Sequence, residues 1–150
     1  MSSTGTVNLH RVLRAPAERI YRAFLTADAV AKFLPPHGFT CRVLELDAKV
    51  GGRYRMQFTN FSQQQPVAFG GEYLELVPGE RIVYNCVFDG ADISDEMRTT
   101  IDLKPVICGT SVSATQTGIP SYIPQDPCYL GWQDTLLQLA NLVEPDIPAG

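Results

Sequence analysis

The sequence feature that most constrains the fold is an apolar pattern close to the C-terminal end of the chain, in residues 131–144. Trp132, Leu136, Leu139 and Val143 recur at positions i, i+4, i+7 and i+11, which places them on one side of an α-helix. Polar side chains fall mostly on the other side. An amphipathic helix needs an apolar surface to pack on, so the rest of the chain has to supply one.

The ends of this helix are marked by prolines. Asp126 followed by Pro127 predicts its start, with an N-cap residue and a proline at the first helical position. Pro145 predicts its end, because proline lacks the backbone N–H and clashes with the preceding turn. A helix of roughly 18 residues would be about 27 Å long.

Segments with strand-like alternation and short turns fill most of the remaining chain. One such segment comes first, and a succession of them after residue 40 predicts an antiparallel meander. The Gly51-Gly52 turn requires either a positive φ or a close approach of two backbone segments. The expected strands are residues 6–14, 40–47, 53–59, 68–77, 81–88, 96–104 and 110–117.

Two short helices are expected between the first two strands. Pro16 and Glu18 mark the start of the first, since proline and an acidic residue both favour the first turn. Asp28 is the expected N-cap of the second, which ends near Phe33.

Length and composition indicate one globular domain. We expect residues 1–150 to form a single domain with an ordered core over about 6–145, because 150 residues can bury a sizeable core. A net charge of −4 and a pI near 5.1 argue against nucleic acid and anionic membranes as partners. The N-terminus does not resemble a signal peptide, and no apolar run is long enough to span a membrane.

The cysteines and histidines do not form a metal-binding pattern. The four cysteines lack Cys-x-x-Cys spacing, and the chain has only two histidines, so we expect no metal site and no disulfide. Small buried thiols in a reducing cytosol are the expected role, which favours a cytoplasmic protein. The cysteines are Cys41, Cys86, Cys108 and Cys128.

Three motifs occur in an order and at separations that resemble one protein family: residues 51–54, residues 71–84, and Gly131-Trp132. The chain is similar, from about residue 6 to residue 145, to the homologues of the activator of the heat-shock-protein-90 ATPase. These belong to the START-like/polyketide-cyclase (SRPBCC) superfamily. The resemblance implies an α+β helix-grip fold, in which a curved seven-stranded antiparallel sheet grips a long C-terminal helix, with two short helices after the first strand. The sequence departs from the family at Phe33, where tryptophan is common, and at Gln116, where histidine is common.

Such a fold implies a cavity between the sheet and the last helix. Tyr84, Thr99 and Gln116 would place hydrogen-bonding groups on its wall, whereas a plain core would favour leucine or valine. Trp132 is expected mainly to anchor the helix, next to a glycine that lets the backbone approach closely. His37 is expected at the cavity mouth. The predicted lining residues are Phe33, Met56, Phe58, Tyr84, Cys86, Met97, Thr99, Gln116, Trp132, Leu136 and Leu139, with the two leucines roofing the cavity.

The first functional hypothesis is a module that binds a small apolar or amphipathic molecule. A co-chaperone-like regulator of the heat-shock-protein-90 ATPase is the second, and it rests on the family resemblance. The third is a cyclase or dehydratase in which Tyr84, Gln116 or His37 polarises a carbonyl group. We expect no cofactor and assign no catalytic residue, because the sequence has no nucleophile–base pair and no phosphate-binding loop. Exposed edge strands favour a homodimer.

Overall fold

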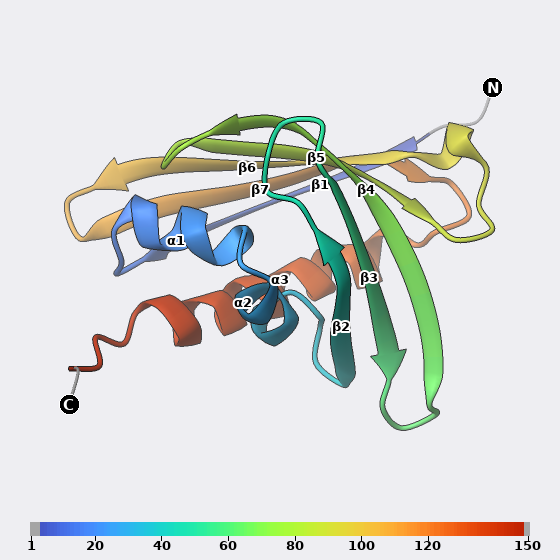
Figure 1. The fold of residues 1–150 in the computed structure, drawn as a ribbon, viewed down its shortest axis with the longest axis horizontal. Helices are drawn as coiled ribbons and strands as arrows, with labels where there is room; N and C mark the ends of the chain where they lie inside the picture. Colours follow the sequence, from blue (N-terminus) through green and yellow to red (C-terminus); the bar gives the residue numbers. More distant parts are fainter. Residues whose placement is uncertain (1–3, 149–150) are drawn as a thin grey trace.

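Residues 4–148 are described by a computed structural model of the chain, shown in Figure 1. The predicted order of elements is confirmed: a strand, two short helices, a meander of strands, and a long last helix. The elements are β1 (Thr4–Leu13), α1 (Ala17–Phe24), α2 (Ala27–Phe33), β2 (Phe39–Leu46), β3 (Arg53–Asn60), β4 (Gln65–Val77), β5 (Arg81–Phe88), the 3₁₀ turn η1 (Ile93–Asp95), β6 (Met97–Val106), β7 (Gly109–Pro120) and α3 (Gln125–Val143).

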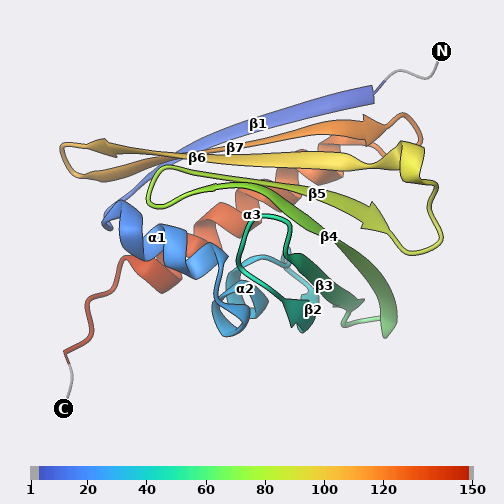
Figure 2. The same cartoon turned by 45° about the horizontal axis from the view of Figure 1, so that its top comes forward.

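The strands form one seven-stranded antiparallel sheet in the order β1-β7-β6-β5-β4-β3-β2. Neighbours in sequence are neighbours in the sheet from β2 to β7, and β1 pairs with β7 at the far edge. The sheet curves, and α3 lies across its concave side with α1 and α2 near one end (Figures 1 and 2). This is the predicted helix-grip fold.

The turn before β3 needs glycine at both positions of the Gly51-Gly52 pair, one for a positive φ and one for a close backbone approach. Gly51 has a φ of +82°, a conformation that L side chains rarely adopt. A Cβ at Gly52 would lie 2.1 Å from the backbone oxygen of Asp47, so the chain can close the turn only without a side chain there. The two alternatives predicted for this pair therefore apply to one residue each.

The predicted N-caps of the two later helices are wrong. α3 begins at Gln125 with Pro124 as its N-cap, so Asp126 and Pro127 lie inside the first turn. The first backbone N–H groups of a helix have no intrahelical partner, which is why Pro127 is tolerated there. α2 begins after Thr26, and Asp28 lies in its first turn, where it faces the positive end of the helix dipole.

The core and a cavity share the space between the sheet and α3. The second half of α3 is packed solidly: Leu136, Leu139, Ala140 and Val143 are each at most 2% exposed. Burial of each of the two leucines and of Val143 stabilises the fold by about 1.5–3 kcal/mol. The first half of α3, by contrast, lines the cavity. Within the described residues, no helix is both long and apolar enough to cross a membrane.

Candidate functional site

A cavity of about 320 Å³ lies between the concave face of the sheet, the first half of α3 and the segment that follows α2. This volume is at the lower end of the range typical of small-molecule sites, about 300–1,000 Å³. Its walls are the residues Phe24, Val30, Leu34, Pro36, Phe39, Tyr54, Met56, Phe58, Val67, Phe69, Tyr73, Tyr84, Cys86, Phe88, Met97, Thr99, Gln116, Pro127, Cys128, Gly131, Trp132 and Thr135.

Aromatic rings make up much of this wall. The rings of Tyr54 and Tyr84 meet edge to face with their centres 5.5 Å apart, and Phe58 and Phe69 do so at 4.8 Å. Edge-to-face pairs of this kind contribute about 0.5–1.5 kcal/mol beyond the area they bury. The aromatic wall is therefore a rigid surface, since each ring is held by its neighbours.

Polar groups on the wall form one row across four neighbouring strands. Tyr73 lies opposite Tyr84, Tyr84 opposite Thr99, and Thr99 opposite Gln116 in the register of the sheet. Directly opposed side chains in antiparallel strands have Cβ atoms about 4.5–5.5 Å apart. We call Tyr73, Tyr84, Thr99 and Gln116 the polar row. The sequence predicted three of its members, and the register shows that they are adjacent.

Trp132, on α3, contacts Gln116 at one end of the polar row. Its indole Nε1–H donates to Oε1 of Gln116 at 3.1 Å. The amide nitrogen of Gln116 then points to the thioether sulfur of Met97 at 3.7 Å, which is a weak acceptor. Because an indole N–H can only donate, this contact fixes which end of the amide faces Trp132.

Ionisable groups on the wall are held in their neutral forms. Burial raises the pKa of Tyr73 to about 12 and that of the Cys86 thiol to about 12. Burial likewise raises the pKa of Tyr54 and of Tyr84, and proximity to Cys86 raises both further. The pKa of Cys128 is also raised by burial. All five groups are therefore protonated at neutral pH.

Charged side chains lie on the other face of the sheet. Arg55, on β3 between Tyr54 and Met56, pairs with Asp89, and Arg81 binds Asp102 at 2.8 Å. These exposed pairs contribute little stability, since exposed ion pairs are typically worth about 0–1 kcal/mol. None of the described residues that line the cavity is acidic, basic or a histidine.

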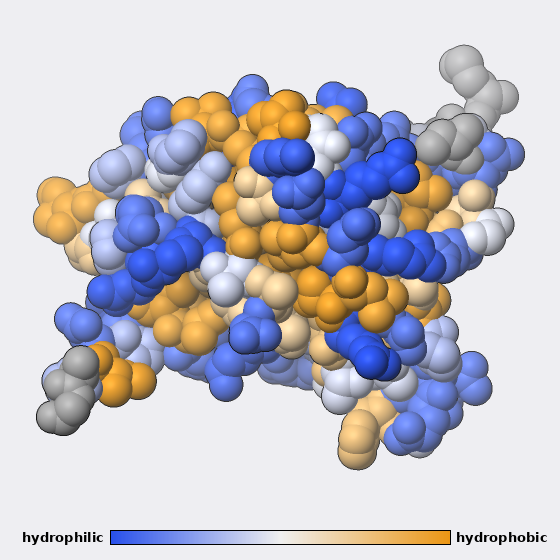
Figure 3. Space-filling model, viewed as in Figure 1, coloured by the Kyte–Doolittle hydropathy of each residue, from blue (hydrophilic) through white to orange (hydrophobic). Residues whose placement is uncertain are grey.

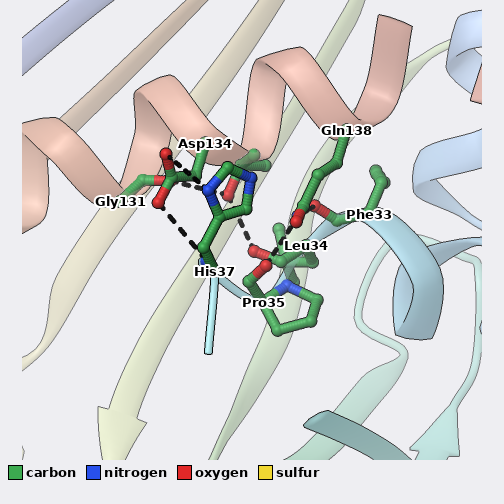
Figure 4. A network of polar contacts seen from close by, with 8 residues as sticks. Phe33, Leu34, Pro35, His37, Gly131, Asp134 and Gln138 are labelled. Carbon is green, nitrogen blue, oxygen red and sulfur yellow. Dashed lines mark hydrogen bonds and ion pairs between the residues drawn. The ribbon is translucent and has the colours of Figure 1, made fainter. Parts of the chain in front are cut away.

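The segment that follows α2 is held in place by side chains of α3 (Figure 4). Nε2 of Gln138 donates to the carbonyl oxygens of Phe33 at 2.8 Å and Pro35 at 2.7 Å. The hydroxyl of Thr135 lies 2.7 Å from the carbonyl oxygen of Leu34. The carbonyl groups of the last residue of α2 and of the two residues that follow it thus receive donors from α3. We call this set of contacts the α3 clamp.

His37 extends the α3 clamp but does not line the cavity. Its backbone N–H donates to Oδ2 of Asp134 at 3.3 Å, and its Nδ1 lies 3.4 Å from Oδ1 of the same carboxylate (Figure 4). The side chain is 59% exposed. Its neighbour Pro36 is on the cavity wall. His37 therefore follows a wall residue in the chain, and its own side chain is turned toward Asp134 of α3 and solvent.

Most of the residues nominated from the sequence lie on the wall, and three do not. Phe33, Leu136 and Leu139 are buried in the core at 0%, 2% and 0% exposure. The two leucines anchor the helix and do not roof the cavity, whereas Trp132 both packs against the core and lines the cavity. On the wall are Met56, Phe58, Tyr84, Cys86, Met97, Thr99, Gln116 and Trp132.

The role expected of Gly131 is also wrong. A Cβ built there would meet only a side-chain carbon of Pro36, at an ordinary contact distance of 3.9 Å, so no close backbone approach requires glycine. Other wall residues were missed. Phe88 continues the alternation of Tyr84 and Cys86 and could have been found by extending it.

The cysteines are free thiols in different surroundings. Cys86 and Cys128 line the cavity, Cys41 is half-buried on β2, and Cys108 is exposed in the turn between β6 and β7. In the part of the chain that the structure describes, no group of three or more potential metal ligands comes together.

Comparisons with known proteins match the fold and the family. The family model described as "Activator of Hsp90 ATPase homolog 1-like protein" matches residues 14–144. The crystal structure of protein CV1439 from Chromobacterium violaceum is similar at 59% identity and a TM-score of 0.90, over 95% of this chain and 99% of that one. A search of curated proteins finds no match.

More distant structures share the fold. Protein NE0264 from Nitrosomonas europaea is 21% identical, with a TM-score of 0.77 over 91% of this chain and 92% of its own. A solution structure described as the Aha1 dimer from Colwellia psychrerythraea is 19% identical, with a TM-score of 0.74 over 93% and 96% of the two chains. The match of the family model over most of the chain, together with the helix-grip fold, shows that this protein belongs to the family of Activator of Hsp90 ATPase homolog 1-like proteins.

Proposed function

We propose that the protein binds a small hydrophobic or amphipathic molecule in the cavity between its sheet and α3. The observation that carries this proposal is the cavity itself, about 320 Å³ in volume and walled mostly by apolar and aromatic side chains, with the polar row on one side. A largely apolar pocket with a few converging polar groups is the usual form of a small-molecule site. The rigid aromatic wall supports a preformed site.

A blocking variant tests the site directly. Gly131 lies on the cavity wall, and its missing side chain would meet only Pro36. Gly131→Leu therefore adds bulk at the cavity while improving helix propensity by somewhat less than about 1 kcal/mol. The matched control is Gln133→Leu, which adds the same side chain at an exposed position of the same helix.

The measurement is the binding of the uncharged fluorescent dye N-phenyl-1-naphthylamine, followed by titration. We expect Gly131→Leu to weaken binding at least about tenfold, a loss of about 1.4 kcal/mol, and Gln133→Leu to leave it unchanged. Equal binding to both variants and the original protein would refute the site. Native mass spectrometry of freshly purified protein complements the titration, since a bound small molecule adds its mass to the protein.

A co-chaperone-like function is the second candidate, favoured by family membership. Apolar side chains gather near the middle of the face shown in Figure 3. On the edge strand β2, Phe39 and Leu44 are 37% and 47% exposed. A pull-down with the heat-shock-protein-90 ATPase checks this, and no association at micromolar concentration would rule it out.

We also propose a homodimer. The sheet ends in two edge strands, β1 and β2, whose outer backbone groups can pair with another strand. The Colwellia psychrerythraea protein of the same fold is described as a dimer. Light scattering coupled to size-exclusion chromatography measures the mass, and a monomeric mass at about 100 μM would contradict the proposal.

A further inference from the structure

We propose that the cavity selects an uncharged ligand that carries a hydrogen-bond acceptor, such as a carbonyl oxygen, and that the amide N–H of Gln116 binds this acceptor. The inference rests on the proposed ligand-binding function and adds the chemical class of the ligand. Its starting point is the juxtaposition of Gln116, Trp132 and Met97 at one end of the polar row.

The amide of Gln116 has a donor without a strong partner. Trp132 occupies the amide oxygen, so the amide nitrogen is turned away from the indole. Its partner in the structure is the thioether of Met97 at 3.7 Å, a poor acceptor compared with a carbonyl oxygen. A ligand acceptor at this position would replace a weak contact with an ordinary hydrogen bond, which typically contributes about 0.5–1.5 kcal/mol.

Two other polar groups of the cavity, those of Tyr54 and Thr99, are less suited to this role. The hydroxyl of Tyr54 already donates to the backbone oxygen of Asn85 at 2.6 Å. Thr99 is 1% exposed and lies opposite Tyr84, close enough to the phenol to oppose part of the rise in its pKa. Gln116 is thus the polar wall residue beside Trp132 whose donor has only a weak acceptor as its partner.

The absence of charge on the described walls argues against an anionic ligand. No acidic, basic or histidine side chain is among the described lining residues, so a bound carboxylate would lose its water without gaining a counter-charge. Burial in this cavity wall also disfavours the anionic forms of the protein's own side chains, since it raises the pKa of Tyr73 and that of Cys86. The same surroundings that keep a phenol and a thiol neutral would disfavour a ligand anion.

Three probes of nearly equal shape separate these contributions. Methyl 2-naphthyl ketone is uncharged and carries an acceptor, 2-ethylnaphthalene lacks the acceptor, and 2-naphthoate carries a negative charge at neutral pH. Calorimetric titration gives their affinities. The single tryptophan provides the site check, since only one indole N–H signal, that of Trp132, is present in a proton–nitrogen spectrum.

We expect the ketone to bind about fivefold more tightly than 2-ethylnaphthalene, and 2-naphthoate to bind at least about 30-fold more weakly than the ketone. Each probe that binds should shift the indole signal. In Gln116→Leu the advantage of the ketone over 2-ethylnaphthalene should fall below about twofold. The matched control is Gln57→Leu, on the outward face of β3 between Met56 and Phe58, which should keep the full advantage.

The outcomes distinguish this inference from the function on which it rests. If 2-naphthoate binds within threefold of the ketone, or if Gln116→Leu keeps the advantage of the ketone, the inference is wrong while the binding function stands. If no probe shifts the Trp132 signal, the binding function fails and the inference falls with it. The probe series on the unmodified protein decides the charge preference even if Gln116→Leu does not fold.

Discussion

Replacement of Gln138 by methionine should destabilise the protein by about 2 kcal/mol. The change keeps the size and flexibility of the side chain but removes the two hydrogen bonds to the carbonyl oxygens of Phe33 and Pro35, at 2.8 and 2.7 Å. A hydrogen bond of this kind contributes about 0.5–1.5 kcal/mol, so the loss of two gives about 1–3 kcal/mol. For a protein of this size, 2 kcal/mol corresponds to a fall in Tm of about 4–8 °C.

The assay is urea unfolding followed by circular dichroism. The midpoint should fall while the slope with urea stays constant, because the surface exposed on unfolding is unchanged. Gln133→Met, at an exposed position of the same helix, is the control and should stay within about 0.5 kcal/mol of the original protein. A loss below 0.5 kcal/mol for Gln138→Met would show that water replaces the α3 clamp at no cost, and the reasoning would be refuted.

Three further changes test other parts of the fold. Gly131→Ala should raise the unfolding free energy by up to about 1 kcal/mol, because alanine has a higher helix propensity than glycine. A lower unfolding free energy, measured by urea titration, would contradict the open space around Gly131. Gly71→Ala should lower it by about 1–3 kcal/mol or more, because the new Cβ would lie 2.0 Å from the backbone oxygen of Asn85; an unchanged melting temperature would be inconsistent with that contact. Stability should also fall as the pH rises from about 9 to about 12. Folding raises the pKa of Cys86 from 9.0 and that of Tyr73 from 10.0 to about 12, so the unfolded chain loses these protons at a lower pH than the folded protein does. A urea midpoint that stays constant over this pH range would count against the burial of the two side chains.

Periodicity was enough to predict the order of the strands and helices, and the family resemblance added the helix-grip arrangement. The alternation along the strands and the 3.6-residue pattern of residues 131–144 each report which side of an element is buried, and one long helix beside a meander leaves few arrangements. The errors lie at the helix ends. Asp126 and Asp28 are favourable both at an N-cap and in the first turn, so residue type alone does not separate the two positions.

The site was only partly predictable, because a cavity forms where side chains leave space unfilled, and a sequence pattern does not report unfilled space. Strand alternation correctly placed pairs such as Met56 and Phe58 on the inner face. It does not report where along α3 the packing ends, and for this reason Leu136 and Leu139 were assigned to the wrong region. Tyr73 was missed because the register of β4 shifts between Tyr73 and Glu75, which breaks the alternation.

The wall supplied by the segment after α2 has no periodic signal at all. Leu34 and Pro36 reach the cavity from a connection whose course is set by the α3 clamp. The partners of that connection lie about a hundred residues later in the chain, and the contact of Gln138 with Phe33 spans 105 positions. Long-range pairing of side chains with backbone oxygens leaves no local trace in a single sequence.

The pairing of β1 with β7 has a consequence for how the chain assembles. Leu9 lies opposite Ala114, so β1 leaves the ribosome long before β7, its partner in the sheet, has been made. Such non-local pairing makes folding slow relative to helical proteins of equal length. The cavity is enclosed later still, when α3 (Gln125–Val143) docks and Trp132 reaches Gln116. Until that moment the aromatic wall faces water, and the nascent chain is most exposed to aggregation just before the cavity is formed.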